Sequence, residues 1–168
     1  MEMEPWEIWV RSTDLHHFVI RHAWVWPTCE TIHYLGLSLL LGTVGLFDLR
    51  ILGMAKAIPP ATLHRLIPLG IGGYLVNLLT GIVFFFGFPD QYAYNSAFHF
   101  KLAFMALAGI NVLVFYSGAF REVAAMGAGA DAPLRGKIIT GISFSAWVCV
   151  LICGRLLTFY RPPFFHHD

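Results

Sequence analysis

The sequence predicts an all-α integral membrane protein, with four transmembrane helices in an antiparallel bundle preceded by an amphipathic surface helix. Composition is the first reason: the 168-residue chain is 57% hydrophobic, and only 12% of it is Asp, Glu, Lys or Arg, whereas a soluble domain carries about 25%. The second is the presence of four apolar segments, each exceeding the ~20 residues that cross a hydrocarbon core. The third is an aromatic content of 15%, with tryptophan and tyrosine near the predicted membrane boundaries, where such residues form interfacial belts.

The amphipathic segment occupies residues 1–26. Apolar residues such as Trp6 and Phe18 alternate there with charged ones such as Glu7 and Arg21. Ser12 or Thr13 could cap a short helix. This pattern predicts a helix lying on the membrane surface. The apolar run is too broken, and lacks the small-residue cleavage site, for a signal peptide.

The four predicted spans form one transmembrane domain over residues 27–160, followed by a tail at 161–168. They cover 27–52, 61–88, 96–120 and 134–160. Prolines mark their limits, because a proline is tolerated in the first turn of a helix and disrupts its interior. Long unbroken apolar runs also disfavour the alternating strands of a membrane barrel.

Basic residues indicate the orientation. With four spans, both termini lie on one side, which carries three basic residues, Arg11, Arg21 and Arg161. The opposite side carries six: Arg50, Lys56, Arg65, Arg121, Arg135 and Lys137. The positive-inside rule then predicts a bacterial inner (cytoplasmic) membrane protein with periplasmic N- and C-termini. At the cytoplasmic end we expect Asp48 to pair with Arg50, Arg65 or Lys137.

Ionisable residues gather near the opposite, outer end of the spans. By the helix rise, His33 lies ~12 Å, His99 ~13 Å and Arg155 ~10 Å from the centre of their spans. Glu30 precedes His33 by three residues and therefore shares its helical face. Ionisable groups at this depth are costly and usually functional.

Haem b is the cofactor that this layer favours. Neutral imidazoles from facing helices bind iron axially, and a four-helix core has room for a porphyrin. We expect His33, and then His99, as axial ligands, with Arg155 or Lys101 pairing with the propionates. Glu30 would orient His33 or accept a proton, and Gly36 would let the ring approach the backbone. The purely structural alternative is that His33 hydrogen-bonds a neighbour, Arg155 neutralises Glu30 and His99 reaches the interface.

A mononuclear copper or zinc site is the other metal chemistry open to this layer. It would use His22, Glu30, His33 or His99. A di-iron centre is disfavoured because the sequence has one Glu-x-x-His pair instead of two. Cys149 and Cys153 are expected to be small packing residues, and a disulfide between Cys29 and Cys153 is the weaker alternative.

Several short motifs resemble a known group of sequences. They are Trp-Pro-Thr-Cys-Glu-Thr-Ile-His-Tyr-Leu-Gly at 26–36, Phe-Asp-Leu-Arg-Ile-Leu-Gly at 47–53, Leu-Ile-Pro at 66–68, Ala-Phe-His-Phe-Lys at 97–101 and Gly-Arg-Leu at 154–156. Together they resemble a family of uncharacterised bacterial four-helix membrane proteins over nearly the whole chain. The pattern is more loosely similar to membrane b-type cytochromes and to the copper-resistance D group. Glu30, His33, Lys101 and Arg155 match the family pattern, and His99 departs from it.

The expected function is that of a small membrane b-type cytochrome-like subunit. It would carry electrons between the quinone pool and a partner at the outer face, with membrane lipids and other membrane or periplasmic subunits as neighbours. The alternatives are a cofactor-free accessory subunit of a larger complex and a copper-handling membrane protein. A net charge of +1 provides no field for capturing nucleic acid. With no nucleophile–base pair or phosphate-binding loop, we expect an electron-transfer or accessory subunit rather than a stand-alone enzyme.

Overall fold

The computed structural model describes residues 3–160, and within that range it contains helices and no strand. Four helical stretches are long and apolar enough to cross a membrane: Val25–Leu52, Pro60–Gly87, Ser96–Ala124 and Leu134–Leu156. The all-helical class and the four apolar segments are therefore confirmed. The third stretch continues four residues beyond the predicted end at 120, and the fourth ends at Leu156 instead of 160. The predicted tail at 161–168 lies outside the described residues.

The long stretches are built from several shorter elements. In chain order these are α1 (Pro5–Arg11), α2 (Asp14–Arg21), α3 (Val25–Leu40), η1 (Leu41–Gly45), α4 (Leu46–Leu52), α5 (Pro60–His64), α6 (Ile67–Gly87), α7 (Pro89–Ala93), α8 (Ser96–Val114), η2 (Phe115–Ala119), α9 (Phe120–Ala124) and α10 (Leu134–Leu156). The η1 and η2 elements are single π-helical turns inside otherwise α-helical stretches. Such turns are often found at functional sites.

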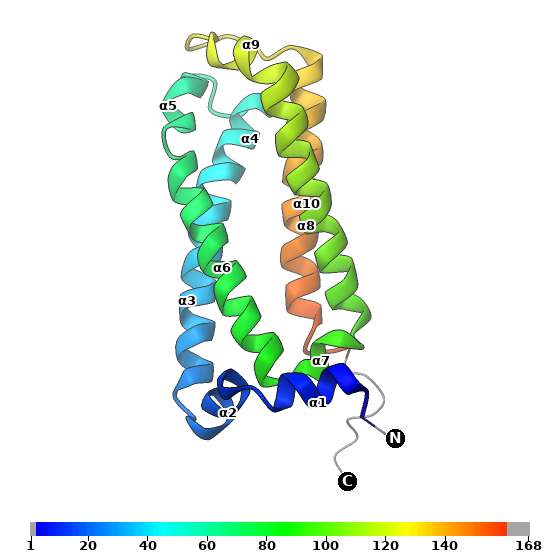
Figure 1. Ribbon diagram of the computed structural model, residues 1–168. Coiled ribbons are helices and arrows are strands. Elements are labelled where there is room, and N and C mark those ends of the chain that lie inside the picture. Colours follow the sequence, from blue (N-terminus) through cyan, green and yellow to red (C-terminus); the bar gives the residue numbers. More distant parts are fainter. Residues whose placement is uncertain (1–2, 161–168) are drawn as a thin grey trace.

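The long helices associate in two pairs. α3 packs along α6, and α8 packs along α10, while α4 packs against α10 and joins the pairs at one end (Figure 1). Glycine allows the closest approach between α3 and α6, because a Cβ at Gly73 would stand only 2.4 Å from the carbonyl oxygen of Gly36. The space beside Gly36 is thus filled by α6, and the expectation that a porphyrin approaches the backbone there is wrong.

The N-terminal segment contains two short helices instead of the single one predicted. Thr13 caps α2, since its side chain accepts a hydrogen bond from the backbone N–H of His16. Both helices lie across the ends of the long helices (Figure 1). His16 Nδ1 donates to the carbonyl oxygen of Phe86 over 2.8 Å, and Arg11 forms an ion pair with Asp90. These contacts attach α1 and α2 to the end of α6 and to α7.

A buried arginine organises the opposite end. Arg50 is 1% exposed, and its guanidinium donates to four backbone carbonyls, those of Ile58 (2.5 Å), Lys56 (3.2 Å), Ala130 (3.2 Å) and Gly127 (3.5 Å). It therefore links the loop after α4 to the loop before α10. No ion pair joins it to Asp48 among the described residues.

Lys137 at this end also has a different partner from the one expected. Lys137 and Lys56 both pair with Asp131, at 2.6 and 3.0 Å. Their hydrogen bonds and charges lower the pKa of Asp131 to about 2. The expected pairing of Asp48 with Arg50, Arg65 or Lys137 is accordingly wrong within the described part of the chain.

Candidate functional site

His33 is held on α3 by a hydroxyl group from α6. Its Nδ1 lies 2.7 Å from Thr80 Oγ1, and the same hydroxyl donates to the carbonyl oxygen of Val76 over 2.7 Å. Because the hydroxyl hydrogen is used in that bond, Nδ1 must be the donor to Oγ1. Nδ1 of His33 therefore carries a hydrogen, and in the neutral imidazole the lone pair is then on Nε2. A second hydrogen bond that fixes the tautomer in this way is typical of metal-binding histidines.

The surroundings of His33 combine an aromatic wall with a cation. The Phe84 ring lies 5.5 Å from the imidazole, centroid to centroid. From α8, the half-buried Lys101 brings a positive charge close enough to act on His33. Its Nζ lies beside α10, 3.9 Å from where a Cβ at Gly154 would stand. Within the described residues no carboxylate lies within 4.0 Å of Lys101.

The structure does not bring His33 and His99 together. His99 is exposed on α8, and its ring contact is with the neighbouring Phe98. His22 is also exposed, with its Nδ1 hydrogen-bonded to the carbonyl oxygen of Phe18 over 2.9 Å. Among the described residues, no three His, Cys, Asp or Glu side chains form a group that could hold a metal ion.

Glu30 and Arg155 do not form the expected ion pair. Both side chains are exposed, and the guanidinium of Arg155 lies over the Phe159 ring, 5.3 Å from its centroid. Glu30 instead influences Tyr92, which follows α6 at the same end. Burial raises the pKa of Tyr92 to about 12, and the negative charge of Glu30 adds to the effect. Of the predicted residues, His33 and Lys101 thus lie partly buried, and Glu30, His99 and Arg155 lie on the surface.

Sequence reasoning missed two groups in the interior. Thr80 is one turn after Asn77 in an apolar run, and nothing in the sequence pairs it with His33. Asp48, predicted as a boundary anchor, is 3% exposed and faces a cavity between the two helix pairs. The sequence did contain a signal for Asp48. An acidic residue inside an apolar span is usually functional.

The chain matches no protein-family model, no curated protein and no solved structure. Its function is therefore inferred from this geometry.

Proposed function

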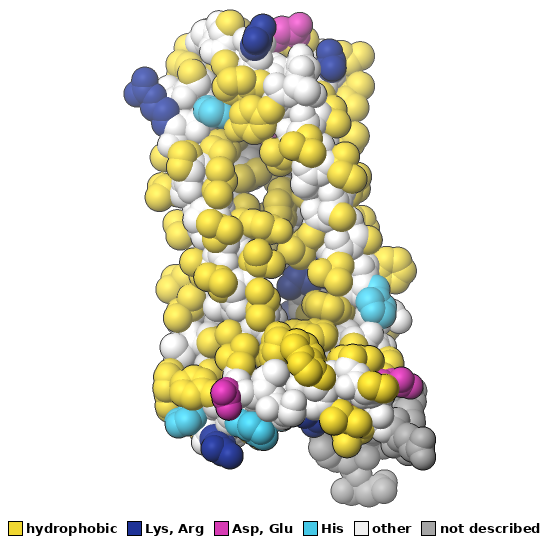
Figure 2. All heavy atoms as spheres, in the orientation of Figure 1, with side chains coloured by type: hydrophobic (Ala, Val, Ile, Leu, Met, Phe, Trp, Pro, Cys, Tyr) yellow, Lys and Arg dark blue, Asp and Glu magenta, His cyan; other side chains and the backbone are white. Residues whose placement is uncertain are grey.

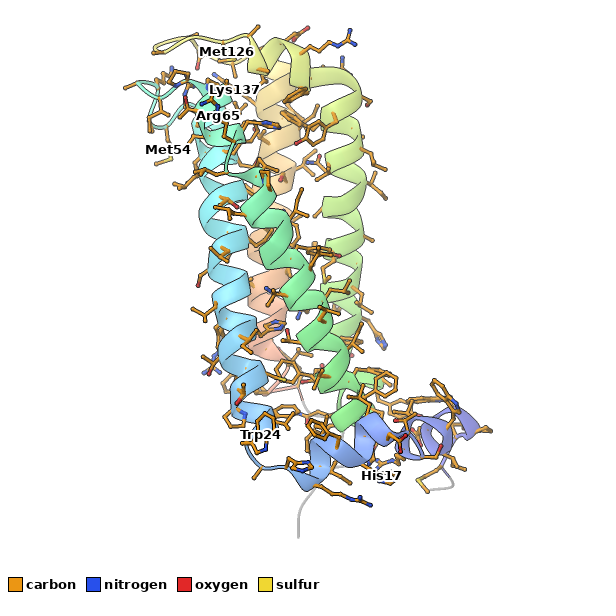
Figure 3. All side chains as sticks on the ribbon, turned by 60° about the vertical axis from the view of Figure 1, so that its left-hand side comes forward. His17, Trp24, Met54, Arg65, Met126 and Lys137 are labelled. Atoms are coloured by element: carbon orange, nitrogen blue, oxygen red, sulfur yellow. The ribbon has the colours of Figure 1, made fainter. Side chains whose placement is uncertain are left out.

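We propose that the four long helices form an antiparallel bundle that crosses the bacterial inner membrane. Side chains on the flanks of the bundle are mainly hydrophobic, and most of the charged ones in view lie toward its two ends (Figure 2). Arg65 and Lys137 lie at one end, and His17 and Trp24 lie at the other (Figure 3). The six basic residues at the first end favour the cytoplasm for it, and the N-terminal helices α1 and α2 then lie at the periplasmic face.

Within this bundle, we propose a small b-type cytochrome-like protein that carries haem b on His33. The observation that carries the proposal is the hydrogen bond between His33 Nδ1 and Thr80 inside an apolar bundle, because a neutral imidazole with its hydrogen on Nδ1 offers the lone pair of Nε2 to a metal. Iron in haem proteins takes such an imidazole as its axial ligand. Around His33, Lys101 would supply a cation for a propionate and Phe84 would supply an apolar wall. We propose His33 alone as the axial ligand among the described residues, because His99 is exposed on α8.

Haem iron supplies a one-electron carrier when it is bound. The protein would contribute orientation and charge: Thr80 holds the ring of His33, and Lys101 offsets negative charge in a medium of low dielectric constant. Near the periplasmic side, such a site would pass electrons between the quinone pool and a partner at the outer face.

The test is the absorption spectrum of protein purified from cells supplied with haem precursor. The proposal predicts a Soret band and a pyridine haemochrome in the wild type and in His22→Ala, the control for an exposed histidine. His33→Ala should lose the haem, and Lys101→Met should bind it more weakly. A colourless wild type in a large assembly would instead favour the accessory-subunit alternative, and bound copper without haem would favour copper handling.

A further inference from the structure

A separate cavity lies between the two helix pairs, toward the end organised by Arg50. It has a volume of about 280 Å³ and is lined by residues of α3, η1, α4, α6, α8, η2 and α10. The space-filling view is hollowed at mid-height, between the two sides of the molecule (Figure 2). Most of the lining is apolar or aromatic, including Leu40, Phe47, Ile71, Met105 and Phe115. Such a chamber favours a lipophilic ligand that enters from the membrane.

Two polar atoms in the wall have no hydrogen-bond partner within the described part of the chain. One is Asp48 Oδ2 and the other is Trp147 Nε1, on side chains that are 3% and 9% exposed. Both residues line the cavity. Leaving such groups unpaired in an apolar interior costs about 1–3 kcal/mol each. An acceptor and a donor left open in one cavity indicate a ligand that presents the complementary donor and acceptor.

Their place in the wall defines the ligand further. The carboxyl group of Asp48 interacts with Ser143 of α10, and Trp147 follows Ser143 by one turn on the same helix. The open acceptor and the open donor therefore both belong to the part of the wall next to α10. A para-dihydroxybenzene ring carries two oxygens, one of which can donate while the other accepts. One hydroxyl could donate to Asp48 Oδ2 while the other oxygen accepts from Trp147 Nε1.

The local helix geometry makes room for such a ring. The π-helical turn η1 immediately precedes the segment that carries Phe47 and Asp48, and η2 begins with Phe115, which is also in the wall. The rings of Phe47 and Phe115 meet edge to face at 5.7 Å, and both residues line the chamber. Tyr74 packs against Trp147 at 6.0 Å. Both π-helical turns of the chain therefore border the cavity.

We propose that this cavity binds the head group of a lipophilic hydroquinone, held between Asp48 and Trp147. The site depends on its own residues and does not require the haem, because Asp48 is fifteen positions from His33 along the helix, or ~22 Å by the helix rise. Bound at this level, a quinol would lie on the cytoplasmic side of the proposed haem.

Calorimetric titration of the purified full-length protein with decyl-ubiquinol tests the proposal. Dithionite keeps both components reduced, so that no electron transfer contributes heat. Saturable binding of the quinol, and at least roughly tenfold weaker binding of its dimethyl ether, are expected, since the ether has no hydroxyl to donate. Equal affinities for the two compounds, or no saturable binding, would overturn the proposal.

Variants locate the site. Asp48→Asn replaces one acceptor oxygen by a donor, and Trp147→Phe removes the indole N–H, so each should weaken binding roughly tenfold. Asp14→Asn and Trp24→Phe are the matched controls, because both side chains are exposed outside the cavity. Wild-type affinity in both Asp48→Asn and Trp147→Phe would overturn the assignment.

A third variant fills the chamber without disturbing the fold. Gly109 lines the cavity, and a Cβ placed on it would meet nothing within 4 Å. Gly109→Phe should therefore abolish binding, whereas Gly72→Phe, at an equally open position outside the cavity wall, should leave it intact. Unchanged binding by Gly109→Phe would contradict the proposal. If the protein binds haem through His33 but binds no quinol, the quinol proposal is contradicted and the haem proposal stands. If a colourless protein binds quinol, the haem proposal is contradicted and the quinol proposal stands.

Discussion

Replacing Gly73 by alanine tests the packing of α3 on α6. The added Cβ would stand 2.4 Å from the carbonyl oxygen of Gly36, and ordinary contact begins at 3.4 Å. Since the obstacle is a backbone atom that cannot rotate away, α3 must withdraw by about 1.0 Å, the difference between these two distances. A gap of that size forfeits about a quarter to a half of the dispersion energy across the contact. Overpacking of this kind costs about 1–3 kcal/mol.

Gly72 provides a matched control on the same helix, one residue away. A Cβ there meets nothing within 4 Å, so Gly72→Ala should stabilise α6 by up to about 1 kcal/mol through helix propensity. Unfolding in mixed detergent micelles, followed by circular dichroism, measures the free energy of unfolding of both variants. Equal stability of Gly73→Ala and Gly72→Ala would refute the close contact between α3 and α6.

Three further predictions concern the two ends of the molecule and the histidine site. Arg50→Met should lower the free energy of unfolding by about 2–4 kcal/mol, because the carbonyls of two loops lose their charged donor. Wild-type stability in the same unfolding assay would contradict the role of Arg50 as a link between these loops. Tyr92 should remain protonated until about pH 12, as read from tyrosinate absorption against Tyr92→Phe. Its folded pKa lies above the unfolded value of about 10, so its contribution to stability is complete below pH 10 and is lost as the pH rises through 12; ionisation near pH 10 in the folded protein would disprove the burial. Thr80→Val removes the hydroxyl that fixes the tautomer of His33, so the chemical shifts of the ring nitrogens should change in nuclear magnetic resonance spectra of histidine-labelled protein. An unchanged spectrum would exclude the Thr80 hydrogen bond.

The helices could be predicted from the sequence because each depends on a local property. Apolar length alone identifies the four long segments, and Thr13 is recognisable as a helix cap from its residue type and position. The π-helical turns were not predicted, since their extra residue is accommodated by packing between helices and leaves no local pattern. The break between α1 and α2 was not predicted, although it falls at Thr13, the residue that caps α2.

Counting residues predicts how far along its helix each site residue lies. It does not predict which side of the helix that residue faces. His33, His99 and Arg155 were placed in one layer by counting residues, which says nothing about which side chains face the interior. The structure turns His33 and Lys101 inward and leaves His99 and Arg155 exposed. Asp48 was misread because its sequence neighbour Arg50 suggested an ion pair, whereas the guanidinium binds backbone carbonyls instead.

The haem content of the purified protein, compared between wild type and His33→Ala, tests the central claim most directly. A free Nε2 on a neutral His33 predicts a Soret band and one haem per chain in the wild type, and loss of both in the variant. A wild type that stays colourless after full haem supply, or a His33→Ala variant that retains its haem, would contradict it.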